Sequence, residues 1–194
     1  VHLDKRMMET SSLAVEGAKL ETIRLGQIAL DNLQMASAAL LEKDHTKIEE
    51  VKHREHVIDN VCDSISEYLI KLCALQISEK ENQTVMSLLN AISDMERVGD
   101  HAENIAEIAE EMEKEDISFS QMAKAELKEM SHAAIASYQN ALKALNDDNI
   151  TYAMKTTVLE EQVDALEKQL RASHIDRLSN AECNVNSGIH FLEL

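Results

Sequence analysis

Residues 51–72 read VKHREHVIDNVCDSISEYLIKL. Along this stretch the apolar side chains recur at alternating intervals of four and three residues, which is the spacing of a helix that buries one face in a bundle. One position in this row is a carboxylate, Glu55. We therefore predict a long helix whose core-facing row is Val51, Glu55, Ile58, Cys62, Ile65, Leu69 and Leu72.

The composition of the whole chain favours helix throughout. The 194 residues include no Pro, no Trp and only four Gly, and aromatic residues make up 3%. Ala, Leu, Glu, Lys and Met are abundant, and these residues lose little conformational freedom in a helix. We predict an all-α fold, and the length suffices for one long bundle or for two bundles of about 100 residues each.

Helix starts are marked by capping boxes, in which a Ser or Thr at the N-cap is followed three residues later by Glu or Gln. Four such pairs stand where a helix is expected to begin: Thr46 with Glu49, Ser78 with Glu81, Ser118 with Gln121, and Ser179 with Glu182. A Thr-Ser-Ser cluster at 10–12 and a polar break at 146–149 mark further boundaries. Six helices are predicted, spanning roughly 12–43, 46–75, 79–114, 119–146, 150–175 and 180 onward.

The two halves of the chain resemble each other. A shift of 105 positions places Glu55 on Glu160 and Asp59 on Asp164. Internal repetition with short connections favours antiparallel neighbouring helices within each repeat. We predict two tandem antiparallel three-helix bundles, the first at 1–115 and the second, C-terminally incomplete with its last helix truncated, at 116–194.

Charge and cysteine content exclude several classes of protein. The net charge is −17, with 36 acidic against 19 basic residues, so the chain repels phosphate backbones and direct nucleic-acid binding is excluded. Three Cys without a CxxC pair indicate buried thiols rather than a disulfide framework. No run of 18 apolar residues and no secretory leader is present, so we expect a soluble chain.

Acidic pairs lie on consecutive predicted helices. Glu55 and Asp59 are four residues apart on the second helix, and Glu96 and Asp100 are four residues apart on the third. Residues at this spacing share one helix face, about 6 Å apart along the axis. If the helices form a hairpin turning at 77–78, the two pairs lie level with each other. Four carboxylates at one level repel unless cations or protons neutralise them, which predicts a metal site.

Oxygen ligands favour hard cations such as Mg²⁺, Ca²⁺ or Mn²⁺, and carboxylate-rich helical sites also hold iron. Gly99 lies between Glu96 and Asp100, and a glycine inside a helix costs about 1 kcal/mol relative to Ala, so we expect something to approach this backbone closely. His101 is either an auxiliary ligand or a surface side chain. The plain alternative is that all these acids form solvated faces of acidic helices.

The segment ERVGDH at 96–101, continuing as NIAE at 104–107, resembles the signature of PhoU-like proteins. That resemblance implies two three-helix bundles that hold multinuclear metal clusters, with iron, zinc, nickel, magnesium or calcium as the metal. It implies a non-enzymatic role in phosphate homeostasis. The ligands it implies are Glu96 and Asp100, Glu55 and Asp59, and, in the second copy, Glu160 and Asp164.

The opening residues HLDKR at 2–6, followed by Glu9-Thr10 and AVE at 14–16, are similar to the segment that precedes the PhoU-like domain of bacterial sodium/phosphate cotransporters. This resemblance implies a cytoplasmic regulatory domain of a sodium-dependent phosphate transporter. Its partner would be the membrane portion of that transporter, at the cytoplasmic side of the cell membrane. Self-association as a homodimer is left open. The alternative is a free-standing PhoU regulator of an ABC phosphate importer and its sensor kinase.

The chain departs from the family pattern in its second half. The repeat places the counterpart of Glu96 beyond Leu194, so we expect the second metal site to be half built. Two readings of another class remain: a helical adaptor without a site, and a ferritin-like di-metal oxidase. The oxidase would use the Glu-x-x-His pairs Glu50 with His53 and Glu129 with His132.

Overall fold

The computed structural model describes residues 3, 8–180 and 183–194, which are almost entirely α-helical, with a 3₁₀ turn at 8–9. This confirms the all-α prediction, and six helices follow one another in that part of the chain. They are α1 (Ser11–Glu42), α2 (His45–Cys73), α3 (Glu79–Lys114), α4 (Gln121–Asp147), α5 (Ile150–Ser179) and α6 (Val185–Glu193).

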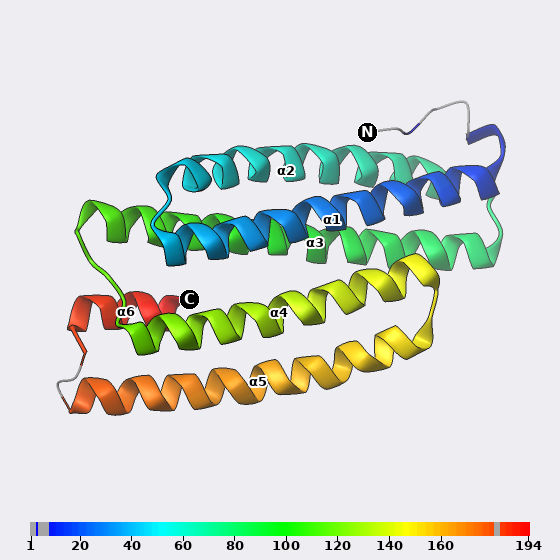
Figure 1. Ribbon diagram of the computed structural model, residues 1–194. Coiled ribbons are helices and arrows are strands. Elements are labelled where there is room, and N and C mark those ends of the chain that lie inside the picture. Colours follow the sequence, from blue (N-terminus) through cyan, green and yellow to red (C-terminus); the bar gives the residue numbers. More distant parts are fainter. Residues whose placement is uncertain (1–2, 4–7, 181–182) are drawn as a thin grey trace.

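The first three helices pack against one another as an antiparallel bundle, and α4 lies along α1 (Figure 1). The next helix, α5, packs on the other side of α4, and the short α6 contacts the C-terminal part of α5. Two clusters of buried apolar residues fill the molecule. The first contains Leu142 of α4 beside residues of α1 to α3, and the second joins Ala36 and Ala102 to Leu170 and Phe191. Both clusters therefore cross the division between 115 and 116 that the repeat predicts.

The α1–α4 packing requires a small residue at position 26. A Cβ atom placed on Gly26 would lie 2.3 Å from Cδ2 of Leu142. The Tyr138 hydroxyl donates a hydrogen bond of 3.3 Å to the Gly26 carbonyl oxygen, which further links α4 to α1. Gly26 thus lets the two halves of the chain approach closely.

Of the four predicted capping boxes, the one at Ser78 is present, with Glu81 as its reciprocal partner. At α2 the cap is Asp44, two residues before the predicted Thr46, because its carboxylate accepts from the backbone N–H groups of Thr46 and Lys47. Asp caps a helix as well as Ser or Thr does, so the earlier position prevails.

Two other predicted helix starts are also wrong. Ser120, not Ser118, caps α4, because the intervening Phe119 is buried in the second core cluster and holds the connection in a non-helical path. Ser179 is the last residue of α5 rather than a cap, since the buried Arg177 keeps the helix packed up to that point. Asn184 caps α6, and the predicted partner Glu182 lies outside the described residues.

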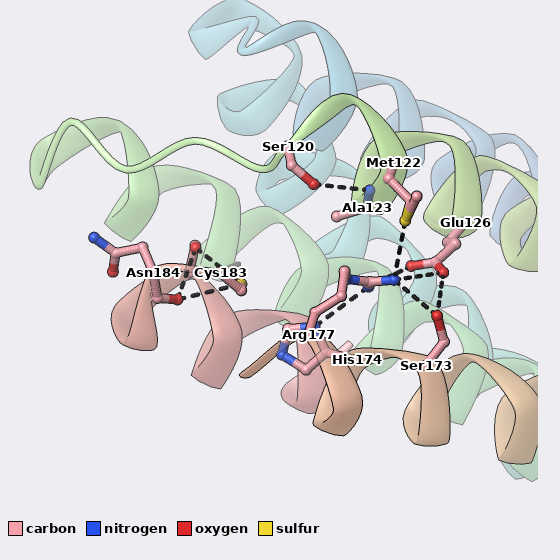
Figure 2. A network of polar contacts seen from close by, with 10 residues as sticks. Ser120, Met122, Ala123, Glu126, Ser173, His174, Arg177, Cys183 and Asn184 are labelled. Atoms are coloured by element: carbon pink, nitrogen blue, oxygen red, sulfur yellow. Dashed lines mark hydrogen bonds and ion pairs between the residues drawn. The ribbon is translucent and has the colours of Figure 1, made fainter. Parts of the chain in front are cut away.

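A polar network joins α4 to α5 (Figure 2). The Arg177 guanidinium on α5 forms an ion pair of 2.5 Å with the Glu126 carboxylate on α4, and the Ser173 hydroxyl donates to the same carboxylate at 3.0 Å. Beside it, the His174 ring stacks on Phe191 of α6 with 4.4 Å between ring centroids. These contacts attach α6 to the C-terminal third of α5.

The rest of α5 is much less covered. Residues 150–169 include no buried side chain, and all the buried positions of this helix, Leu170, His174 and Arg177, lie after them. The apolar side chains of Ile150, Met154 and Val158 are 72%, 66% and 54% exposed. The N-terminal two thirds of α5 therefore packs mainly against α4 (Figure 1).

The three cysteines are free thiols, but only Cys62 is buried. The expectation of three buried thiols is wrong for Cys73, which is exposed because it ends α2 beyond the core-facing row, and for Cys183, which is half-buried. None of the described helices is both long enough and apolar enough to cross a membrane.

Candidate metal centre

The core-facing row predicted for α2 is confirmed, since all seven of its members are buried. Glu55 is 4% exposed and lies between Val51 and Ile58, neither of which is accessible. Its Oε1 atom is buried without a hydrogen-bond partner. A buried carboxylate oxygen without a partner costs free energy, so this atom is suited to receive a cation or a proton.

Two neighbours on α2 complete a compact group of potential ligands. One ligand atom each from Glu55, His56 and Asp59 lies within 4.8 Å of the others, and no other set of three such residues is as close within the described part of the chain. Nδ1 of His56 lies 3.6 Å from Oε2 of Glu55. Both His56 and Asp59 are exposed, so the group is accessible to solvent although Glu55 itself is buried.

The electrostatics of the site connect it to α3. Burial raises the pKa of Glu55 from 4.5 to about 7, assisted by the hydrogen bond and the charge of Asp59 and then by the charges of Glu103 and Asp100. Like charges and desolvation both disfavour a second anion here. The acids of α3 therefore face Glu55 closely enough to affect its ionisation.

A second indication comes from Cys62, which lies two turns beyond Glu55 along α2. Burial raises the pKa of its thiol to about 12, and the charges of Glu96 and Asp59 add to this. The charge of Glu96 on α3 thus acts on the same thiol as that of Asp59 on α2. Both Glu96 and Asp100 are exposed, and neither belongs to the compact group around Glu55.

The α2–α3 pair approaches closely at Gly99. This glycine is buried, and a Cβ atom there would lie 3.1 Å from Cγ2 of Ile58. Ile58 lies between Glu55 and Asp59 in sequence, so its contact with Gly99 brings the acidic face of α2 toward that of α3. A side chain of α2 is therefore what approaches this backbone.

Two of these residues were missed by sequence reasoning. Glu103 could have been found, because it follows Asp100 by three positions and so shares its helix face. His56 carries no comparable signal, because adjacent residues on a helix point about 100° apart, and only the folded structure shows its ring close to the Glu55 carboxylate.

The remaining predicted ligands are not assembled. Glu160 and Asp164 are both exposed on α5, and among the described residues they belong to no group of three potential ligands within 4.8 Å of one another. They lie before the first buried position of this helix, Leu170. His101 is exposed on α3.

The pairs of the di-metal oxidase reading are likewise dispersed. Glu50 forms an ion pair of 2.8 Å with Arg54, and His53 is exposed. Glu129 and His132 are exposed on α4. Within the described chain, none of the four belongs to a close group of three potential ligands.

The donor set fits a metal ion. Carboxylates of Glu55 and Asp59 with the His56 imidazole supply oxygen and nitrogen ligands, and Glu96, Asp100 and Glu103 add negative charge nearby. Oxygen with one imidazole suits Mn²⁺, iron and Zn²⁺, while the carboxylates alone suit Mg²⁺ and Ca²⁺.

Comparison with known proteins identifies the family. The PhoU domain model matches residues 22–109 and 127–194. The chain is 24% identical to a phosphate-specific transport system accessory protein PhoU homologue of Clostridium acetobutylicum, over 89% of the chain and 78% of that protein. It is 21% identical to YjbB of Escherichia coli, whose name assigns it to inorganic phosphate export, over 97% of the chain but 35% of that protein.

The fold also matches a solved structure. The crystal structure of the phosphate transport system regulatory protein PhoU from Streptococcus pneumoniae superposes with a TM-score of 0.84 at 22% identity, covering 94% of this chain and 85% of that one. This agreement confirms the fold, and the family model that matches most of the sequence establishes that the chain belongs to the PhoU domain family.

Proposed function

We propose that this chain is a non-enzymatic regulator of phosphate transport that acts as an accessory protein of a phosphate transport system. The proposal is supported by family membership and by relatives named as accessory proteins of phosphate-specific transport systems, which the chain matches over 78% and 77% of their length. It acts at the cytoplasmic face of the membrane on the membrane portion of the transporter. The names of these relatives favour the free-standing regulator over the domain of a sodium-dependent transporter that the opening residues implied. Residues 2 and 4–6 of that opening segment lie outside the described part of the chain.

One observation keeps an appended domain as the second candidate. The alignment with YjbB covers 97% of this chain but 35% of that protein, so a unit of this size is found there within a longer chain. The gene sequence upstream of Val1 separates the two candidates. A series of transmembrane helices in the same reading frame supports the appended domain, and a nearby initiator codon supports the accessory protein.

We further propose that Glu55 and Asp59 bind a divalent or trivalent cation, with His56 as an additional ligand and with Glu96 and Asp100 completing the site from α3. The observation that carries this proposal is the buried Glu55 carboxylate, whose Oε1 atom has no hydrogen-bond partner. A bound cation would satisfy that oxygen and offset the repulsion among the surrounding acids. It would also hold α2 and α3 together, which makes the surface of this bundle depend on metal occupancy.

Metal binding can be tested on the purified chain. After removal of metal by a chelator, the protein is equilibrated with Mn²⁺, Zn²⁺, Fe³⁺, Ni²⁺, Mg²⁺ or Ca²⁺, and bound metal is measured by mass spectrometry together with Tm. We expect at least one of these ions to bind and to raise Tm, and the double variant Glu55→Gln, Asp59→Asn to bind at least about tenfold more weakly, because it removes two anionic ligands.

The matched control is Glu160→Gln with Asp164→Asn, which makes the same changes at the repeat-related positions on α5. It should bind the ion as the unmodified chain does. Absence of metal from the unmodified chain would instead support a helical adaptor whose acids only keep it dissolved. Equal losses in both double variants would show that the ion has no preference for the group around Glu55.

The regulatory role is tested in cells from which the gene has been deleted. Complementation with the unmodified gene should restore the dependence of phosphate uptake on external phosphate. If metal occupancy controls docking, the Glu55→Gln, Asp59→Asn gene fails to restore it although the protein accumulates normally. Restoration by this variant would separate regulation from metal binding.

A further inference from the structure

A groove separate from the metal centre runs between the C-terminal half of α1 and the N-terminal half of α4. Its volume is about 660 Å³, which is within the range of small-molecule sites. From α4 it is lined by Lys124, Lys128 and His132, and from α1 by Gln34 and Ser37.

The cationic side chains of α4 follow one another at intervals of four residues, so they share the face that lines the groove. Neither lysine has an acidic residue three or four positions away on α4. No ion pair joins either lysine to a carboxylate among the described residues, whereas Lys47, Lys52, Lys71 and Lys114 all have one. Two unpaired ammonium groups one turn apart are unexpected in a chain of net charge −17.

The one carboxylate of the groove does not compensate them. Glu42, at the α1 end, forms its ion pair with Lys47, which follows it across the α1–α2 connection. The local charge of the groove is therefore positive although the protein as a whole is strongly negative.

Hydrogen-bond donors surround these cations. Ser37 Oγ accepts a bond of 2.9 Å from the Ser131 hydroxyl, which leaves the hydroxyl hydrogen of Ser37 available to a ligand. The amides of Gln34 and Gln121 also line the groove, and Gln121 is the first residue of α4, where the helix dipole is positive. Apolar side chains, among them Leu41 and Ile135, form the remaining wall and reduce competition from water.

We propose that this groove binds a phosphate oxyanion, with Lys124 and Lys128 as its cationic ligands and His132 and Ser37 as further hydrogen-bond donors. Ammonium groups spaced about 6 Å apart along the helix can share one phosphate or contact successive phosphoryl groups of a short polyphosphate. This site goes beyond the regulatory function proposed above and does not depend on the metal centre. Occupancy would tighten the α1–α4 contact, which joins the two halves of the chain.

The test is a titration of the purified chain, followed by backbone amide chemical shifts in NMR spectra. Orthophosphate and tripolyphosphate are titrated separately, with ionic strength held constant by sodium chloride. We expect saturable shifts centred on the amides around Ser37 and Lys124, and at least about tenfold weaker binding in the double variant Lys124→Gln, Lys128→Gln. Saturation by orthophosphate identifies the free ion as the ligand, and saturation by tripolyphosphate alone identifies an oligophosphate.

The control is Lys155→Gln with Lys168→Gln, which removes the same charge from exposed positions of α5 and should bind as the unmodified chain does. Unsaturable shifts in both titrations, shifts centred away from the groove, or equal losses in the two double variants would overturn the proposal. Because shift positions are read on the unmodified chain, the test stands even if one variant folds poorly. Metal content measured in parallel shows whether the proposed metal site is absent, independently of the result for the groove.

Discussion

Glu55 lies in the apolar core-facing row of α2 and close to several other acidic side chains, and both surroundings disfavour its charged form. Its carboxyl group is 4% exposed, and the nearby charges of Asp59, Glu103 and Asp100 all oppose its ionisation. In the absence of a cation, the ionised form therefore destabilises the folded chain. The ionised carboxylate that would bind a cation is thus the form that destabilises the metal-free protein.

The first prediction concerns the pH dependence of this conflict. The folded-state pKa of Glu55 is about 7 against 4.5 for an ordinary glutamate, so the penalty is absent below about pH 4.5 and complete above about pH 7. Without metal, Glu55→Gln should therefore raise the free energy of unfolding at pH 8 by about 1–3 kcal/mol, and at pH 5 by much less, below about 1 kcal/mol. Urea denaturation in the presence of a chelator measures both values.

Glu49→Gln is the matched control, since Glu49 is exposed on the same helix. It should shift stability by less than about 0.5 kcal/mol at both pH values. A gain for Glu55→Gln that is equal at pH 5 and pH 8 would contradict the argument, because a pH-independent gain reflects packing rather than ionisation.

At this scale the sequence predicted the position of Glu55 but not its partners. Periodicity places it in the core row of α2, because helical spacing fixes which face a residue occupies. Spacing along the helix does not fix side-chain rotamers, so the orientation of the His56 imidazole toward Glu55 could not be predicted. The separation of Glu96 and Asp100 from the compact group likewise depends on side-chain geometry.

Among the helices, α2 and α3 are brought together at Gly99, whose absent side chain leaves space for Ile58. We predict that Gly99→Leu lowers the free energy of unfolding by about 1–3 kcal/mol, because the added side chain must displace Ile58. It should also weaken metal binding, although no ligand is altered, since α2 and α3 move apart. Chemical denaturation and metal titration measure the two effects.

Combining Gly99→Leu with Ile58→Ala tests this cause. The smaller side chain at 58 creates space for the leucine, so the two changes together should cost less than the sum of their separate effects. Strict additivity in stability and in metal affinity would show that the contact between these positions is not what the leucine disturbs.

Helix existence was more predictable than helix boundaries. The capping box at Ser78 is present because no competing cap precedes it, whereas Asp44 and Ser120 displaced the predicted caps of α2 and α4. The end of α5 depends on tertiary contacts: Arg177 and His174 extend the helix by packing against α4 and α6 (Figure 2). Local sequence cannot report such contacts.

In the molecule as a whole, the repeated sequence does not produce two independent cores. Leu142 of α4 joins the core of the first three helices, and Ala36 and Ala102 join that of the last ones. The repeat predicted the order of helices, because each copy carries the same periodicity. The repeat could not predict the contact between α1 and α4. This packing depends on residues such as Gly26, and no sequence pattern indicates which distant side chain a glycine will contact.

The uneven covering of α5 has a consequence for how the protein opens. Residues 150–169 bury no side chain, so little free energy is needed to unwind this stretch while the rest stays folded. We predict that its backbone amides exchange with deuterium at least about tenfold faster than those of the buried centre of α3, as measured by hydrogen-exchange mass spectrometry. Equal protection of the two sets of amides would contradict this prediction, because it would mean that packing against α4 is enough to keep residues 150–169 folded. Otherwise this segment, which carries Glu160 and Asp164, is the first to fray under thermal motion and the first that a protease would cut.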